Sequence, residues 1–215
     1  MIVKICGITN LEDALISVEY GADMLGFNFY PLSPRFIRPE TCRQIMEALN
    51  GSRVQGVGVF VNAAVAEIRQ VMQMCRLDLA QLSGDEPPAH LEELRGCAFK
   101  ALRPVSGQAL ESALHRYPRR GEPPAYLLDA YHSTVYGGSG RRVSLELAGA
   151  LAARFPILLA GGLTPENVSA VVEKVQPYGV DVASGVESAP GKKDADRLRE
   201  FIRAARHALQ QQSEI

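Results

Sequence analysis

The stretch IVKICGITNLED, residues 2–13, contains the transition that decides between two α/β folds. An apolar run ends at Cys6, a glycine follows directly, and Asn10 is a residue type that caps helix N-termini. A doubly wound sheet would normally carry a G-x-G-x-x-G fingerprint at this position, and the stretch lacks that spacing. The stretch therefore favours another arrangement of parallel strands and crossover helices.

Further apolar runs follow the first one, and helical patterns separate them along the chain. The runs are IVKI, MLGFNF, VQGVGVFV, LDLAQL, AFKALR, AYLLD, PILLAGG and GVDVAS. Eight strand–helix units within 215 residues suit the compact end of the (β/α)8 range. We therefore predict an α/β fold, a single (β/α)8 TIM barrel that occupies residues 1–215 as one domain. A doubly wound sheet is the alternative.

Two of the expected helices have recognisable starts. Asn10 predicts a helix whose apolar face contains Leu11, Ala14, Leu15 and Val18. Thr164 is expected to cap a later helix, with Pro165 at its first position.

The charge pattern argues against two classes of partner. The formal net charge is -1 and the basic residues are dispersed, which gives no electrostatic footprint for nucleic acid or for an anionic membrane. No apolar run approaches the roughly 18 residues that span a bilayer, and Glu12, Asp13 and Glu19 stand where a secretory signal would be apolar. We predict a cytoplasmic protein, and a monomer because no unclaimed apolar stripe stands out.

The cysteines and histidines do not indicate a metal site. No Cys-x-x-Cys pair occurs, and the histidines do not fall at successive strand ends, so we predict no metal. Cys42, Cys75 and Cys97 are interpreted as buried small hydrophobes. Cys6 stays open between that interpretation and a thiolate base or nucleophile whose pKa nearby cations would lower.

Chemistry in such barrels belongs at the carboxyl ends of the strands. Strand alternation points Lys4 and Cys6 inward at one end of the chain, and Asp181 inward near the other. The first and last strands are neighbours in a closed barrel, so Lys4 and Asp181 are predicted to lie close together. The same parity points Asp129 into the barrel mouth, where it is either a general acid or a loop cap.

Glycine-containing turns indicate a phosphate site. AGGLTPEN and ASGVE follow the last two expected strands, where (β/α)8 barrels commonly bind phosphate, and GGSG precedes them. The candidate phosphate-binding residues are Gly138, Ser139, Gly140, Gly161, Gly162, Leu163, Ser184 and Gly185. Arg35, in the proline-restricted stretch FYPLSPRF, either binds a carboxylate or forms an ordinary surface salt bridge.

The chain resembles the phosphoribosylanthranilate isomerases of tryptophan biosynthesis. The matching stretches are KICGIT, GFNFYPLSPR, GVFVN, QLSGDE, LLD, GGSG, LAGGLTPENV and GVDVASGVE, in this order. The resemblance implies a phosphosugar substrate and a cofactor-free Amadori rearrangement. Cys6 would be the base, Asp129 the acid and Arg35 the group that holds the anthranilate carboxylate, with Gln81 and Asp181 as further substrate-binding residues.

Two stretches depart from the family pattern. Ser83 stands where relatives usually carry histidine, and GGSGRRVSLELA replaces a loop that usually continues with Phe-Asp-Trp. These departures keep two alternatives open. One is a phosphosugar-binding barrel that has lost catalysis, and the other is a different phosphosugar isomerase or epimerase of the same fold.

Overall fold

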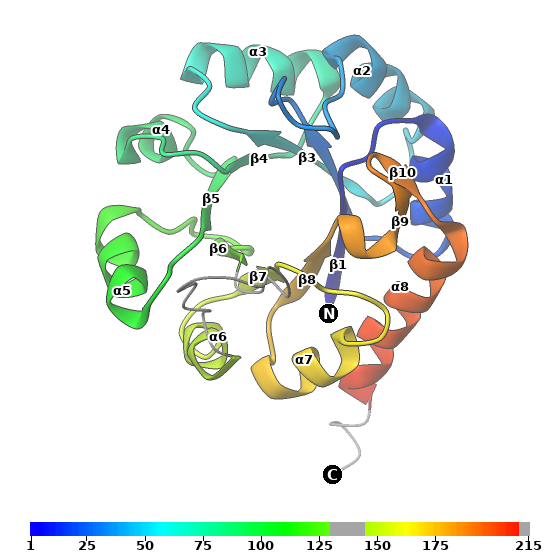
Figure 1. Ribbon diagram of the computed structural model, residues 1–215. Coiled ribbons are helices and arrows are strands. Elements are labelled where there is room, and N and C mark those ends of the chain that lie inside the picture. The colour runs from blue at the N-terminus through cyan, green and yellow to red at the C-terminus, as the bar shows by residue number, and fades with distance from the viewer. Residues whose placement is uncertain (130–144, 211–215) are drawn as a thin grey trace.

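The computed structural model describes residues 1–129 and 145–210, and these form a closed barrel of parallel strands (Figure 1). Each strand pairs with the next, and the last pairs with the first. The strands are β1 (Ile2–Cys6), β2 (Met24–Asn28), β3 (Gln55–Phe60), β4 (Leu79–Leu82), β5 (Ala98–Leu102), β6 (Tyr126–Asp129), β7 (Ile157–Ala160) and β8 (Gly179–Val182). The predicted fold class is confirmed, and each predicted run contains one barrel strand.

The helices form a ring outside the barrel (Figure 1). They are α1 (Leu11–Glu19), α2 (Pro39–Ala48), α3 (Val65–Cys75), α4 (Pro88–Glu93), α5 (Gly107–Arg116), α6 (Leu145–Ala152), α7 (Val168–Val175) and α8 (Ala195–Gln210). None of the helices in the ranges 1–129 and 145–210 is long and apolar enough to cross a membrane.

An additional hairpin lies between β8 and α8. A short 3-10 helix, η1 (Ser184–Val186), leads into β9 (Glu187–Ala189), which pairs antiparallel with β10 (Lys192–Lys193). The sequence did not predict this hairpin. It lies over the junction of β1, β8 and α1 (Figure 1).

Strand alternation sorts the apolar side chains into two cores. Tyr126 and Leu128 belong to the layer between barrel and helices, whereas Leu127 belongs to the barrel interior, as the parity predicts. The interior cluster contains Met24, Val57, Leu79, Phe99, Ala101, Leu127, Leu158 and Ala160. Above this cluster, the inward positions become polar, and that change marks the functional end of the barrel.

The barrel closes around a buried ion pair. Lys4 and Asp181 stand opposite each other in the β1–β8 register, and Lys4 Nζ lies 2.7 Å from Asp181 Oδ1, as predicted. Burial lowers the pKa of Lys4, but Asp181 and Cys6 together more than offset this effect, so the pKa of Lys4 is raised. Lys4 therefore stays charged inside the barrel.

The predicted buried face of α1 is confirmed in part. Ala14 is fully buried and Val18 packs against the core, whereas Leu11 and Leu15 are 42% and 47% exposed and Asp13 is buried in their place. The cap itself is confirmed, because Asn10 Oδ1 accepts the Asp13 N–H at 2.8 Å. Asp13 Oδ2 in turn accepts the backbone N–H of Lys193, at 2.8 Å, so the unpredicted hairpin decides which face of α1 is covered.

The predicted start of the helix after β7 is also wrong. Residues 165–167 form a turn, and α7 begins at Val168. Asn167 Oδ1 accepts the Thr164 N–H at 2.9 Å, and its Nδ2 donates to the Gly162 carbonyl at 3.0 Å. These bonds fix the glycine turn before the helix begins.

One cysteine assignment needs correction. Cys42 and Cys75 are buried as expected, whereas Cys97 is exposed. The reason is that Cys97 lies in the turn that precedes β5, outside the strand itself.

Replacing Lys4 by Met should lower the free energy of unfolding by about 3 kcal/mol, because Asp181 becomes a buried charge without its cation. Adding Asp181→Leu should restore part of this loss, since no charge then remains inside the barrel. Urea unfolding followed by circular dichroism measures both changes. An unchanged unfolding midpoint for Lys4→Met would contradict the stabilising role of the pair.

Candidate functional site

A cavity of about 950 Å³ opens at the carboxyl ends of the barrel strands. Loops after β2, β3, β4, β5, β7 and β8 contribute to its wall. The candidates from the sequence that line it are Gln81, Asp129, Gly161, Gly162, Leu163, Asp181, Ser184 and Gly185. Cys6 and Arg35 do not line this cavity, and Gly138, Ser139 and Gly140 fall outside the described residues.

The glycine-containing loops after β7 and β8, which are the candidate phosphate-binding loops, lie directly against each other. Gly161 and Gly162 adopt φ values of 99° and 64°, which L side chains rarely adopt. A Cβ atom on Gly185 would collide with the carbonyl oxygen of Leu163, so the close approach of the two loops requires glycine there. This geometry exposes backbone at the cavity wall, where a phosphate needs N–H donors.

Arg197 is a lining residue that the sequence analysis missed. It lies in the first turn of α8, where its Nε donates to the Gly185 carbonyl at 3.0 Å. Its Nη1 lies 3.2 Å from Glu166 Oε1, in the turn after β7. Arg197 thus links the two loops, and its charge is paired with the Glu166 carboxylate. The sequence signal that could have identified this residue is an arginine in the first turn of the helix that follows ASGVE.

Cys6 ends β1 on the inner side of the barrel, beside Lys4. A Cβ atom on Gly26 would lie 2.8 Å from Cys6 Sγ and 3.0 Å from Lys4 Nζ, so this glycine leaves room for both groups. Burial raises the pKa of the Cys6 thiol; Lys4 and Lys193 oppose the shift, Asp181 adds to it, and the pKa stays raised. Of the two states that the sequence left open for Cys6, this environment favours the neutral thiol at neutral pH.

Asp129 ends β6 and lines the cavity, as the parity predicts. Its strand is separated from β1 by β7 and β8, so the carboxyl group and the Cys6 thiol approach the barrel mouth from different sides.

Gln81 and Ser83 form a polar pair in the cavity wall. Gln81 Nε2 donates to Ser83 Oγ at 3.0 Å. Gln81 Oε1 is buried and has no hydrogen-bond partner within the part of the chain that the structure describes. The serine that departs from the family pattern thus orients the glutamine amide and leaves its oxygen available to a ligand.

A buried ion pair holds the loop after β4. Lys100 Nζ lies 2.8 Å from Glu86 Oε2, and Glu86 Oε1 accepts the N–H groups of Asn62 and Gly84 at 3.0 and 2.8 Å. The loop that follows Ser83 is therefore fixed by charge-assisted hydrogen bonds.

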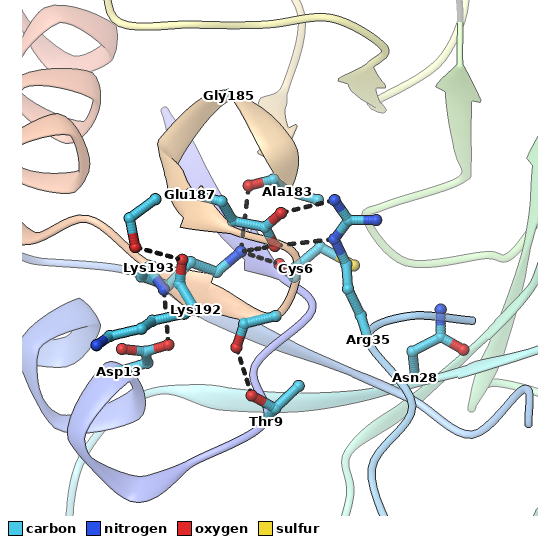
Figure 2. A network of polar contacts seen from close by, with 12 residues as sticks. Cys6, Thr9, Asp13, Asn28, Arg35, Ala183, Gly185, Glu187, Lys192 and Lys193 are labelled. Atoms are coloured by element: carbon cyan, nitrogen blue, oxygen red, sulfur yellow. Dashed lines mark hydrogen bonds and ion pairs between the residues drawn. The ribbon is translucent and has the colours of Figure 1, made fainter.

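Arg35 is bound to a carboxylate of the protein itself. Figure 2 shows its guanidinium directed at Glu187, with Nε 2.8 Å from Oε1 and Nη2 2.6 Å from Oε2. Lys193 Nζ lies 3.0 Å from the same Oε1 and also donates to the carbonyls of Cys6 and Ala183. Burial raises the pKa of Glu187, but Arg35 and Lys193 outweigh this effect, so the pKa lies below its ordinary value.

The site offers no cluster of metal-binding side chains among the described residues. Within the described residues, no group of three or more His, Cys, Asp and Glu side chains is placed to hold a metal ion.

The fold and the cavity define a (β/α)8-barrel enzyme whose cavity lies at the carboxyl ends of the strands. The family model described as N-(5'phosphoribosyl)anthranilate (PRA) isomerase matches residues 3–204, and the chain belongs to this family.

Individual relatives agree with the family match. The N-(5'-phosphoribosyl)anthranilate isomerase of Trichlorobacter lovleyi is 50% identical over 208 residues, which cover 96% of this chain and 98% of the relative. The crystal structure of phosphoribosyl anthranilate isomerase from Thermotoga maritima has a TM-score of 0.83 and 42% identity, covering 96% of this chain and 100% of that one. A structure of phosphoribosyl anthranilate isomerase in complex with reduced 1-(o-carboxyphenylamino)-1-deoxyribulose 5-phosphate has a TM-score of 0.81 and 40% identity. The match covers 96% of this chain and 100% of that one.

The raised pKa of Cys6 predicts a pH profile for its alkylation. The thiolate is the reactive form, so the rate with iodoacetamide should rise through a midpoint above the ordinary cysteine value of about 8.5. The experiment uses a Cys97→Ser background, because Cys97 is exposed and would react first. The double variant Cys97→Ser with Cys6→Ser is the control, because it measures the alkylation of the remaining cysteines. A midpoint below the ordinary value would contradict the raised pKa.

Proposed function

We propose that the chain catalyses the Amadori rearrangement of N-(5-phosphoribosyl)anthranilate to 1-(2-carboxyphenylamino)-1-deoxyribulose 5-phosphate, with Asp129 and Cys6 as acid and base. Its membership of the PRA isomerase family supports the reaction. The observation that carries the assignment of roles is the placement of Asp129 in one cavity with the anion loops, while Cys6 ends the strand beside Asp181. The proposed chemistry moves protons only and uses no cofactor.

In the proposed mechanism, Asp129 protonates the ring oxygen of the furanose. The bond between this oxygen and sugar carbon 1 breaks, and the nitrogen lone pair forms a Schiff base. Cys6 then removes the proton from carbon 2, which gives an enolamine that tautomerises to the ketone. The raised pKa of Cys6 makes its thiolate scarce at neutral pH but strongly basic once formed.

Binding of both ends of the substrate would place the sugar between acid and base. We propose that residues 161–163 and 184–185 hold the phosphate, together with Gly138, Ser139 and Gly140. The Gln81 amide oxygen would accept a hydrogen bond from a sugar hydroxyl, and Asp181 would contact the sugar from the β8 side.

Arg35 can hold the anthranilate carboxylate without releasing Glu187. Its bonds to Glu187 use the Nε–Nη2 edge of the guanidinium. The Nη1–Nη2 edge has a second pair of N–H donors with the same fork geometry. The salt bridge considered from the sequence and the carboxylate-binding role are therefore compatible.

Substitution of the proposed acid and base tests the assignment. Asp129→Asn and Cys6→Ser should each lower kcat by about 100-fold or more, because each removes a general acid or base. Turnover is measured by the loss of fluorescence of freshly prepared phosphoribosylanthranilate, with Cys97→Ser as the matched cysteine control. Binding without turnover by the unmodified chain would favour a barrel that has lost catalysis. Unimpaired turnover in both variants would contradict the assigned roles.

We also propose that the chain is a cytoplasmic monomer. The large apolar side chains exposed among the described residues are few and come from four segments, and they are Leu11, Leu15, Leu32, Phe36, Met74 and Val105. Light scattering during gel filtration should give a mass near 23.3 kDa. Twice that mass would contradict the monomer.

A further inference from the structure

We propose that Glu187 is a positioning residue for Arg35, holding one edge of its guanidinium so that the other edge faces the substrate carboxylate. The inference rests on the proposed function, because it names the group that orients one of the proposed substrate contacts. Figure 2 shows the arrangement, in which Glu187 lies between Arg35 and Lys193.

The geometry of the pair fixes the guanidinium plane. Two parallel hydrogen bonds, of 2.8 and 2.6 Å, join Arg35 to both oxygens of Glu187. The Glu187 side chain is only 4% exposed, whereas that of Arg35 is 23% exposed. A buried carboxylate thus anchors a cation that still reaches solvent, which separates this pair from an ordinary surface salt bridge.

Glu187 is itself held from the opposite side. Lys193 is fully buried and joins Glu187 Oε1 to the carbonyl oxygens that end β1 and follow β8, those of Cys6 and Ala183. The hairpin that carries both residues is tied to the β1–α1 segment, because Thr9 Oγ1 donates to the Gly191 carbonyl and Asp13 accepts the Lys193 N–H. Glu187 therefore cannot turn away without breaking several buried bonds.

The charges of the three groups favour an anionic ligand. Two cations, Arg35 and Lys193, share one carboxylate, so the cluster keeps a net positive charge. The Lys193 side chain has no accessible surface, so Arg35 is the cation of this cluster that a ligand can contact. A planar carboxylate matches the N–H fork on the remaining edge of Arg35.

The same cluster connects the carboxylate-binding group to the proposed base. Lys193 donates to the carbonyl of Cys6 at 2.6 Å, and the Arg35 side chain packs over Gly7, the next residue. A Cβ atom on Gly7, whose φ is 77°, would lie 2.6 Å from Arg35 Cδ. Arg35 and Cys6 are thus fixed to one backbone segment, which keeps their spacing constant.

Calorimetric binding of two ligands tests the proposal. The first probe is reduced 1-(o-carboxyphenylamino)-1-deoxyribulose 5-phosphate, which carries the aromatic carboxylate, and the second is ribose 5-phosphate, which lacks it. Glu187→Gln should weaken the first by about 10-fold, because an amide N–H then faces an arginine N–H. Its affinity for ribose 5-phosphate should change less than twofold. Glu187→Asp, which retains the charge but shortens the reach, should show the same selective loss.

A double-mutant cycle identifies the route of the effect. If Glu187 acts through Arg35, then Arg35→Ala with Glu187→Gln should bind the first probe no more weakly than Arg35→Ala alone. Glu200→Gln makes the same chemical change on the exposed surface of α8 and should leave both affinities unchanged. Equal losses for both probes, no loss, or additive effects of the two substitutions would overturn the positioning role.

The failure of the positioning role and the failure of the proposed function give different results. If the unmodified chain binds the first probe but does not turn over phosphoribosylanthranilate, the proposed function fails while the selective loss in Glu187→Gln still supports positioning. If the unmodified chain turns over the substrate and Glu187→Gln binds both probes normally, the positioning role alone fails.

Discussion

The pairing of β1 with β8 is the contact on which the rest of the site depends. It brings the two ends of the sequence together, so that Cys6 lies beside the loop and hairpin that follow β8. The Lys4–Asp181 pair stabilises this seam from inside the barrel, and the Lys193–Glu187 pair joins the same strands at the mouth. A chain that failed to close here would separate the proposed base from the groups proposed to bind the carboxylate and the phosphate.

Buried ion pairs recur around the mouth of the barrel. Among the described residues, Lys4–Asp181, Lys100–Glu86 and Lys193–Glu187 each have both side chains at most 10% exposed. Burying such charges is costly, and each pair offsets the cost by short bonds and, for Lys100 and Lys193, by further bonds to backbone carbonyls. The physical result is a set of fixed charges and donors that need little rearrangement when a charged ligand enters.

Much of the fold followed from periodicity in the sequence. The period of two residues along each strand predicted the inward positions, including that of Asp129 and the Lys4–Asp181 contact. The glycine turns after β7 and β8 were equally visible, since their placement at strand ends is a rule of the fold.

The remaining features depended on long-range contacts that no local pattern encodes. The strands β9 and β10 contain three and two residues, which are too few to show a period. Their hairpin binds Asp13, which is buried, whereas Leu11 on the same helix is exposed. The same hairpin carries Glu187, whose partner Arg35 is distant in sequence. The pKa of Cys6 was also beyond local inference, because burial and three neighbouring charges act on it together.

The central claim is that the barrel mouth holds a phosphosugar between Asp129, which lines the cavity, and Cys6, which ends β1, while Arg35 holds its carboxylate. A crystal structure of this chain with reduced 1-(o-carboxyphenylamino)-1-deoxyribulose 5-phosphate tests the claim most directly. The account predicts the phosphate at residues 161–163 and 184–185, the carboxylate on the Nη1–Nη2 edge of Arg35, and sugar carbon 2 facing the Cys6 sulfur. A ligand bound in the reverse orientation, or with carbon 2 turned away from Cys6, would contradict it.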